Sequence, residues 1–301
     1  MTDAEGSRCT SETDMIIHVD CASHVYADGS VGLHEMCFFV RRGEVVVVCG
    51  ANGSGKSTLI EHLNGGLVPE EGRIEVHGET VDERRRHELW KTVGVVFQDA
   101  DSQLFAPTVL EDVAFGPLNL GLSPDEARKV ACRALEAVDA VRLIEKIPAY
   151  MSGGEKRLAA IAGILAMQPE VIALDEPTSD LDPAHAARIE SLVRELRERG
   201  EFGIVLSTHD LDLASRIADR VVILRDGSVI AEGLPRDVFY DRALLERSGL
   251  VEPCVVRIWR AVRGDGEGAM DPRPITEEEL VEALKTGLNH RCRRDLEGGA
   301  D

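Results

Sequence analysis

The chain has 301 residues, a formal net charge of −20 and a hydrophobic fraction of 44%. These values suit one large globular domain with an appendage, or two modest domains. The acidic balance argues against a general nucleic-acid-binding protein, whose surface would be basic. The longest nearly unbroken apolar stretch, residues 158–167, is about half of what a bilayer span needs. We therefore expect any role at a membrane to depend on partner subunits.

The N-terminal residues 1–13 are polar and acidic, which predicts disorder and argues against a secretory signal. The seven cysteines are scattered and never spaced C-x-x-C, so we expect reduced cytosolic thiols and no zinc site. The cysteines are Cys9, Cys21, Cys37, Cys49, Cys132, Cys254 and Cys292.

Apolar strands and amphipathic helices alternate along the chain, which predicts an α/β fold with a parallel core. Strands are predicted at 15–19, 44–49, 73–76, 94–97, 171–174, 204–207 and 221–224. Helices are predicted at 58–64, 125–139, 153–167, 184–199 and 211–217. Asp28-Gly29 predicts a turn, and Asp226-Gly227 between two apolar runs predicts a hairpin.

Two further segments are predicted from their composition. The stretch between Gln98 and Val171 is mostly helical, so we interpret it as a subdomain set on the α/β core. Residues 263–272 have the composition of a flexible linker. After them, Thr276 and Glu279 form a T-x-x-E capping box for a short helix to about residue 287.

The segment 50–58 reads GANGSGKST and matches the phosphate-binding loop G-x-x-x-x-G-K-[ST]. A β-branched run precedes it and a helix follows it, which is the context that this motif requires. Lys56 would supply charge to the β- and γ-phosphates, and Ser57 a hydroxyl for Mg²⁺. The chain is therefore predicted to bind a nucleoside triphosphate. The predicted nucleotide contacts are Gly50, Asn52, Gly53, Ser54, Gly55, Lys56, Ser57 and Thr58.

Two carboxylates, Asp175 and Glu176, follow the apolar run 171–174. In phosphate-loop enzymes a strand-end aspartate is linked to Mg²⁺. The second carboxylate can act as a general base toward an attacking water. Alone, an acid after an apolar strand is weak evidence, but the phosphate loop strengthens it.

A second anion site is predicted where Ser152-Gly153-Gly154-Glu155 opens a helix, because exposed amides and a hydroxyl gather there. The alternative is an ordinary capped helix. The order of the motifs favours the functional interpretation: phosphate loop, Gln98, the Ser152 motif, the two carboxylates and then His209.

This ordered set resembles the ATP-binding subunits of ABC transporters over about residues 14–240. The resemblance implies that Tyr26 stacks on adenine and that Gln98 links Mg²⁺ and the γ-phosphate to the transmembrane subunit. It implies that residues 152–155 are the family signature, which contacts the ATP held by the opposite protomer. Tyr26 could instead be an ordinary half-buried aromatic.

The same resemblance assigns roles to the other motifs. Asp175 would anchor Mg²⁺ together with Ser57 and Gln98, and Glu176 would polarise the attacking water. Residues 179–182 match the D-loop, whose Asp182 counts among the nucleotide-site residues, and His209 matches the switch histidine. His209 could also be a plain strand-end histidine. Catalysis would rest on Glu176, His209, Gln98 and Lys56. The histidines without a motif are expected to be structural or solvent-facing: His18, His24, His34, His62, His77, His87, His185 and His290.

The segments 95–122 and 152–183 are similar to energy-coupling factor (ECF) ATPases, above all those of cobalt and nickel uptake. A small helical tail after about residue 240 is also common in ECF ATPases. Met151, Glu155 and Asp180 depart from the usual family residues, and Asp180 places a charge near the expected dimer seam.

The resemblance thus implies an ABC-type phosphate-loop NTPase core at 14–240 with a helical subdomain at about 99–168, and a helical extension at 241–301. It implies an ATP- and Mg²⁺-dependent motor, as a homodimer or ATPase heterodimer, peripheral on the cytoplasmic side of the cell membrane. Its partners would be a transmembrane coupling subunit and a substrate-binding membrane subunit, with no nucleic acid. The implied cargo is cobalt or nickel, and vitamin uptake is the alternative.

A soluble ABC ATPase of DNA repair or translation is the rival in another class. Repair types insert coiled coils or zinc modules, but the stretch between Lys56 and Ser152 holds no heptad run and no C-x-x-C. Translation factors usually carry two nucleotide domains, whereas this sequence has one phosphate loop.

Overall fold

The computed structural model describes residues 15–264 and 271–286. The predicted disorder of residues 1–13, the middle of the predicted linker and the end of the predicted last helix lie outside these ranges. Among the described residues, none of the helices combines the length and apolar character that a bilayer crossing requires.

A six-stranded sheet forms the centre of the molecule, in the order β10-β9-β3-β8-β7-β6. Five of its strands, β3 and β6 to β9, run parallel, and β10 pairs antiparallel with β9. The strands are β3 (Val45–Cys49), β6 (Val93–Val96), β7 (Val171–Asp175), β8 (Gly203–Thr208), β9 (Arg220–Arg225) and β10 (Ser228–Gly233). The parallel α/β core is confirmed, and the predicted turn at Asp226-Gly227 joins β9 to β10.

A second sheet is antiparallel, with the order β2-β1-β4-β5. Its strands are β1 (Met15–Val25), β2 (Val31–Arg41), β4 (Glu71–Val76) and β5 (Glu79–Thr80). Only the first five residues of β1 were predicted as a strand, and β2 was not predicted. Both strands contain register shifts, and Cys21 and Glu35 have positive φ angles of 49° and 45°. These irregularities break the two-residue alternation on which strand prediction depends.

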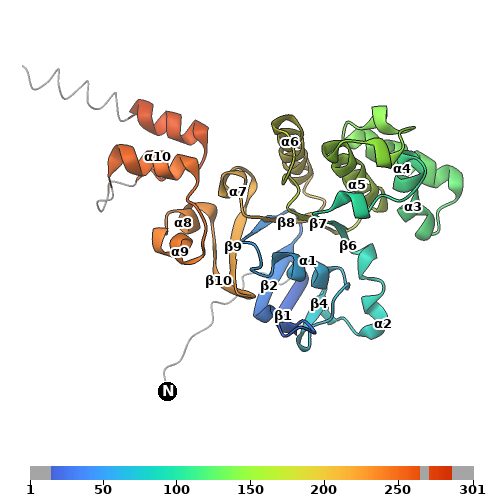
Figure 1. Cartoon of the computed structure of the whole chain (residues 1–301), viewed down its shortest axis with the longest axis horizontal. Coiled ribbons are helices and arrows are strands. Elements are labelled where there is room, and N and C mark those ends of the chain that lie inside the picture. The colour runs from blue at the N-terminus through green and yellow to red at the C-terminus, as the bar shows by residue number, and fades with distance from the viewer. Residues whose placement is uncertain (1–14, 265–270, 287–301) are drawn as a thin grey trace, which may run out of the picture.

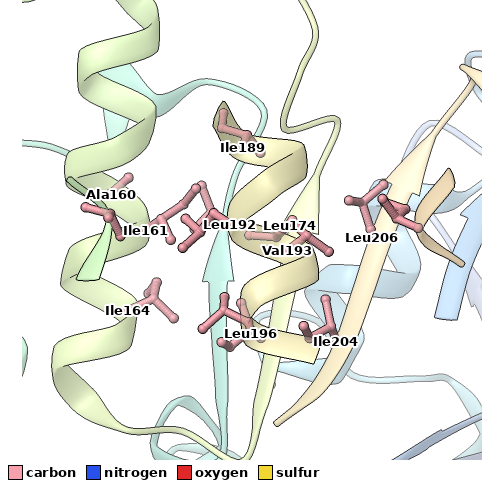
Figure 2. Packing of buried hydrophobic residues seen from close by; sticks show 14 of the residues in the cluster. Ala160, Ile161, Ile164, Leu174, Ile189, Leu192, Val193, Leu196, Ile204 and Leu206 are labelled. Atoms are coloured by element: carbon pink, nitrogen blue, oxygen red, sulfur yellow. The ribbon is translucent and has the colours of Figure 1, made fainter. Parts of the chain in front are cut away.

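Helices and the second sheet cover opposite faces of the central sheet. Helices α5 (Gly153–Met167) and α6 (Pro183–Arg199) pack on one face, where their apolar side chains meet those of β7 and β8 (Figure 2). On the other face, α1 (Lys56–Leu63) and the antiparallel sheet share a second core with β3 and its neighbours. Because both faces are covered, β3, β7 and β8 are buried along their whole length.

The segment predicted as a helical subdomain contains α3 (Val109–Asn119), α4 (Pro124–Ala137) and α5, with short 3₁₀ turns between them. These helices lie together beyond the β6 edge of the sheet (Figure 1). Helix α3 was not predicted individually, and Pro117 lies inside it. The predicted helices at 153–167 and 211–217 match α5 and α7 (Leu211–Ile217). The single turn α2 (Glu83–Arg86) follows β5.

The C-terminal helices lie beyond the opposite edge of the sheet (Figure 1). They are α8 (Pro235–Phe239), α9 (Arg242–Arg247), α10 (Cys254–Arg263) and a helix at 277–286. The last two share a small core of Val255, Trp259, Leu280 and Ala283. The amide of Glu279 donates to Thr276 Oγ1 at 3.3 Å, as the predicted capping box requires, but the Glu279 carboxylate accepts from the amide of Ile275.

Candidate nucleotide-binding site

The phosphate loop leaves the end of β3 and enters α1 at Gly55. Gly53 and Gly55 have φ angles of +79° and +102°, which residues with a Cβ rarely adopt. A Cβ on Gly55 would also lie 2.5 Å from the carbonyl oxygen of Gly32. No side chain caps the N-terminus of α1. The first amides of this helix are therefore left for an anion, as the phosphate-loop motif predicts.

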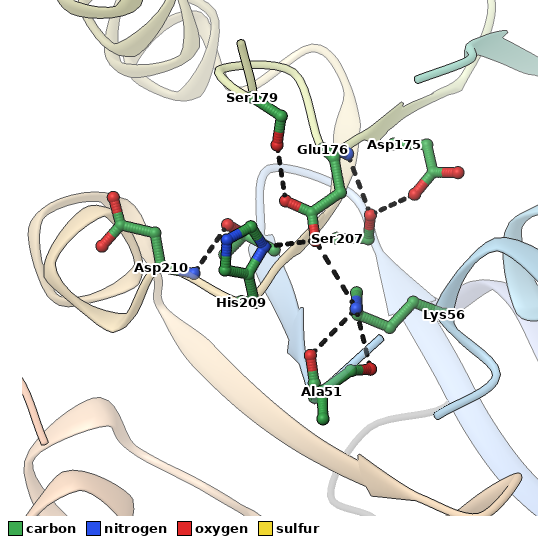
Figure 3. A network of polar contacts seen from close by, with 10 residues as sticks. Ala51, Lys56, Asp175, Glu176, Ser179, Ser207, His209 and Asp210 are labelled. Carbon is green, nitrogen blue, oxygen red and sulfur yellow. Dashed lines mark hydrogen bonds and ion pairs between the residues drawn. The ribbon is translucent and has the colours of Figure 1, made fainter. Parts of the chain in front are cut away.

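Lys56 is buried, and its ammonium group is held at three points (Figure 3). The Nζ atom donates to the carbonyl oxygens of Gly50 at 2.9 Å and Ala51 at 3.2 Å, and it lies 3.5 Å from Glu176 Oε1. A buried ammonium without such partners would be costly. The loop thus holds its charge in place before any phosphate arrives.

Glu176 is the centre of the polar network in Figure 3. Its Oε1 atom lies 3.0 Å from His209 Nδ1, and its Oε2 atom accepts a hydrogen bond from Ser179 Oγ at 3.0 Å. The Glu176 amide donates to Ser207 Oγ at 3.0 Å. Its φ angle of 45° is uncommon for a residue other than glycine and is typical of functional sites. The structure therefore brings together three of the predicted catalytic residues, Glu176, His209 and Lys56.

Ser207 is a residue of this site that the sequence analysis did not assign. Its hydroxyl donates to the buried carboxylate of Asp175 and accepts from the Glu176 amide. Ser207 and Asp175 are register partners on the parallel strands β8 and β7. The carboxyl ends of parallel strands lie at the same edge of a sheet. A serine near the end of the predicted strand 204–207 could therefore have indicated a residue beside Asp175.

A hollow of about 430 Å³ lies beside the loop and is lined by nine of the predicted residues. They are Tyr26, Asn52, Gly53, Gly55, Lys56, Ser57, Thr58, Gln98 and Glu176. Ser30, Val31 and Gly32 also line it, and the sequence analysis missed them because it missed β2. Gly50 and Ser54 of the loop do not line this hollow, and the buried Ser54 Oγ finds no hydrogen-bond partner among the described residues.

Tyr26 stands at the wall of this hollow. Its hydroxyl is 2.9 Å from Thr58 Oγ1. A Cβ on Gly32 would lie 2.8 Å from Thr58 Cγ2 and 2.9 Å from Tyr26 Cε2. A glycine at position 32 therefore makes room for the aromatic ring beside α1.

Gln98 is exposed at the rim of the hollow, and Arg157 fixes the backbone beside it. The Arg157 guanidinium donates to the carbonyl oxygens of Phe97 at 2.5 Å and Gln98 at 2.7 Å. Burial lowers the pKa of this guanidinium. Arg157 was not predicted, since an arginine within an amphipathic helix shows no distinctive spacing.

The signature residues 152–155 do not line the hollow of their own chain. Ser152 caps α5 and forms a complete capping box with Glu155. Lys146 lies 2.8 Å from the Glu155 carboxylate and holds the pKa of that group below its usual range. In the isolated chain the signature is thus a well-capped helix start, which was the alternative interpretation.

Asp182 caps α6 by accepting hydrogen bonds from the amides of Ala184 and His185. The bonds from the His185 amide and from the His185 ring lower the pKa of the Asp182 carboxyl. The His185 Nδ1 atom lies 2.6 Å from Asp182 Oδ2. A Cβ on Gly154 would lie 2.3 Å from the His185 ring. His185, which matched no motif, therefore joins the D-loop segment to the signature.

Mg²⁺ prefers oxygen ligands, and the predicted metal residues offer only such ligands. Ser57 provides a hydroxyl and Gln98 an amide oxygen at the hollow, and Asp175 a carboxylate at the end of β7. This donor set fits Mg²⁺.

The fold and this site define an ATP-binding cassette, and comparisons with known proteins agree. The family model described as "ABC transporter" matches residues 33–179. A second model, described as "AAA domain, putative AbiEii toxin, Type IV TA system", matches residues 147–215.

Curated relatives narrow the class. The energy-coupling factor transporter ATP-binding protein EcfA of Methanocaldococcus jannaschii is 47% identical over 235 residues, which cover 77% of this chain and 84% of the relative. EcfA of Methanococcus maripaludis is 46% identical, with 77% and 84% covered. A putative ABC transporter ATP-binding protein of Methanosarcina mazei is 41% identical, and this chain spans only 60% of its length.

Solved structures show the same architecture. The structure of cbiO1 from Clostridium perfringens, described as part of the ABC transporter complex cbiONQ, has a TM-score of 0.69 and 37% identity, covering 78% of this chain and 94% of that one. A dimeric cassette in a post-hydrolysis state, bound to ADP and phosphate, has a TM-score of 0.66 and 28% identity. The match covers 73% of this chain and 99% of that one. This chain belongs to the ABC transporter ATP-binding proteins, an ATPase family, and is EcfA-like.

Proposed function

We propose that this chain is the ATP-hydrolysing subunit of an ECF-type importer and that it powers uptake of cobalt or nickel ions. Two relatives quoted above are named EcfA, and the cbiO1 structure is described as part of a transporter complex. Within this chain, the contacts of Glu176 are the observation that supports ATP hydrolysis. They place a buried carboxylate between Lys56 of the phosphate loop and His209.

The geometry supports hydrolysis by in-line attack of water on the γ-phosphate, with positioning and charge neutralisation as the main sources of rate. The amides at the start of α1 and the Lys56 ammonium would bind the phosphates, and the phosphate charge would replace the Glu176 partner of Lys56. Glu176 would then accept the proton of the attacking water at its carboxylate. His209, 3.0 Å from that carboxylate, would hold it toward the γ-phosphate. Tyr26 would stack on the adenine base.

Ser57, Gln98 and Asp175 would hold Mg²⁺, which neutralises phosphate charge when it is bound. Ser207 positions Asp175, because its hydroxyl donates to that carboxylate from a fully buried place near the end of β8. Arg157 positions the backbone of Gln98.

The working unit would be a dimer, as a homodimer or with a related ATPase. Residues 152–155 of each chain do not line the hollow of that chain. They are therefore available to contact ATP bound by the partner chain. Structures of related cassettes are described as dimers. ATP would hold the two chains together and its loss would let them separate, as a ligand-driven shift between two states.

The membrane partners would dock near Gln98, where the surface carries two apolar rings. Phe105 is 66% exposed, and its ring contacts that of Phe115 edge-to-face at 4.8 Å between centroids. The Asp112 carboxylate accepts from the amides of Phe105 and Ala106 at 2.8 and 2.7 Å and so fixes this loop. An exposed and ordered aromatic pair is typical of an interaction surface. A transmembrane coupling subunit there would keep the ATPase at the cytoplasmic face of the membrane, beside a substrate-binding membrane subunit.

Replacing Phe105 with Asp tests this surface. The variant should leave the membrane fraction of cells that express the whole complex, while the purified protein keeps its basal ATPase activity. Val251→Asp is the matched control, since Val251 is 67% exposed but lies in the C-terminal region. Equal membrane retention of the two variants would contradict the docking site.

The cargo is decided by the membrane subunits, because the ATPase does not touch it. ATP-dependent uptake of labelled cobalt, nickel and biotin by cells with the whole complex is the deciding measurement, with Glu176→Gln as the inactive control. Metal uptake that needs ATP hydrolysis supports the proposal. Vitamin uptake without metal uptake overturns the cargo and leaves the motor assignment in place.

A further inference from the structure

Three chemically related side chains meet on the antiparallel sheet, away from the phosphate loop. Cys21 Sγ on β1 and Cys37 Sγ on β2 lie 3.6 Å apart, and both residues are exposed. The Asp20 carboxylate completes the group, and one ligand atom from each residue lies within 4.8 Å of the others. No role described above uses these residues.

A β-bulge brings the two cysteines to the same place. In the β1–β2 register Val19 pairs with Phe38 and Ala22 with Met36, so Asp20 and Cys21 together oppose Cys37. Cys21 takes a φ angle of 49°, a conformation that costs about 1–3 kcal/mol outside glycine.

The neighbouring strand makes room for this bulge at Gly72. A Cβ on Gly72 would lie 2.3 Å from the Cys21 carbonyl oxygen. Gly72 has a φ angle of +80°, so this position favours glycine twice over. The bulge is therefore supported from both sides and is a defined feature of the sheet.

We propose that Asp20, Cys21 and Cys37 bind one thiophilic divalent cation of the zinc type, with water as the fourth ligand. Two thiolates bound to one tetrahedral Zn²⁺, at about 2.3 Å each, lie roughly 3.8 Å apart. The two sulfurs are already separated by nearly this distance. Spacing along the sequence predicted no zinc site, because these cysteines are 16 residues apart and meet only through strand pairing.

A cation site explains more of the arrangement than a redox pair does. A disulfide would use the two cysteines alone and would not involve the Asp20 carboxylate beside them. A divalent cation binds both sulfurs as thiolates and releases their protons.

Arg73 supports the third ligand. It lies 2.7 Å from Asp20 Oδ2 and donates to Glu75 Oε1 at 2.7 Å. Glu75 keeps Arg73 paired when a cation takes a share of the Asp20 charge. The site also lies on the two strands of the hairpin whose turn contains Tyr26. A bound cation would therefore link β1 to β2 near the residue proposed to stack on adenine.

Zinc binding to the full-length chain tests this proposal. The protein is reduced with a phosphine, stripped of metal and titrated with Zn²⁺ alone against a chromogenic chelator, without nucleotide. We expect one high-affinity zinc per chain, lost in the Cys21→Ser/Cys37→Ser double variant and weakened at least about tenfold in Asp20→Asn. The matched control is Cys254→Ser, which removes another exposed cysteine and should bind zinc normally. Unchanged zinc binding by the double variant would overturn the proposal.

A second measurement needs no variant. Zn²⁺ should protect Cys21 and Cys37 of the wild-type chain from maleimide, as read by peptide mass mapping, while Cys254 stays reactive. Co²⁺ alone should give the charge-transfer absorption of a thiolate complex. Equal labelling with and without Zn²⁺ would contradict the site. Oxidation of this pair by a small-molecule disulfide, in a reduced protein that binds no zinc, would show a redox pair instead.

Discussion

Two helix N-termini in this molecule were predicted as anion sites, and they differ in their hydrogen bonding. Helix α1 starts at Gly55 without a side-chain cap. Helix α5 starts at Ser152 with a complete capping box, in which Ser152 accepts from the Glu155 amide and Glu155 from the Ser152 amide. The first amides of α1 have no side-chain acceptor and are available to a ligand, whereas the capping box of α5 satisfies amides of its own helix start.

This difference fits the proposed ATP site, to which one chain would contribute two unequal parts. The start of α1 faces the hollow beside Lys56 and Glu176, so its ligand can bind to a single chain. At the start of α5, Ser152 and Gly153 are exposed, and the capping box is complete within one chain. A site shared between two chains needs both properties.

Glu176→Gln should have the largest effect on the α1 part. It removes the carboxylate that would accept the proton while keeping the shape of the side chain, so turnover should fall about 10²–10⁴-fold. Nucleotide binding should remain, as measured by fluorescence titration with an ATP analogue. Lys56→Ala should weaken binding itself and serves as the contrast. Hydrolysis by Glu176→Gln at a rate near that of the wild type would refute the role of this carboxylate.

Ser152→Arg should lower hydrolysis by the dimer about 10²-fold, as expected when a contact to the transferred phosphate is lost. Binding of nucleotide to the isolated chain should be nearly unchanged, because Ser152 does not line its hollow.

The chain offers a matched control for this change. Ser123 closes an equivalent capping box with Glu126 on α4, so Ser123→Arg removes the same kind of cap from another helix. It should leave hydrolysis intact. If both variants lose activity equally, the effect of Ser152→Arg is structural. Normal hydrolysis by a chain shown to be monomeric would refute the shared site.

Ser207→Ala tests how firmly the carboxylates of the α1 part are held. It leaves the Glu176 amide and the Asp175 carboxylate without their shared partner in a buried position. The free energy of unfolding should fall by about 1–3 kcal/mol. Chemical denaturation measures this value, and Ser191→Ala, on the partly buried surface of α6, should change it much less.

Asp182→Ala should have the smallest effect. It removes the N-cap of α6 and should lower the free energy of unfolding by about 1 kcal/mol. If Asp182 also belongs to the shared site, ATP hydrolysis will fall by more than this loss of stability explains. An activity equal to that of the wild type would leave Asp182 with a capping role alone.

The sequence alone was sufficient where chemistry is local. The phosphate loop was readable because its glycines, lysine and serine act within nine consecutive positions, between a buried strand and a helix. The bounds of α5 and α7 agree with the predicted helices for the same reason. Capping residues and apolar periodicity mark a helix within its own segment. The carboxylate pair was found because it directly follows an apolar strand.

The tertiary structure decided what depends on residues far apart in the chain. Ser207 reaches Asp175 only because β8 lies beside β7, and Arg157 reaches Gln98 only because α5 packs near β6. Strand β2 and the Cys21–Cys37 contact depend on a bulge that breaks the local pattern. Pairing between strands that are distant in the chain sets such contacts, and a local motif spans too few residues to reveal which strands become neighbours.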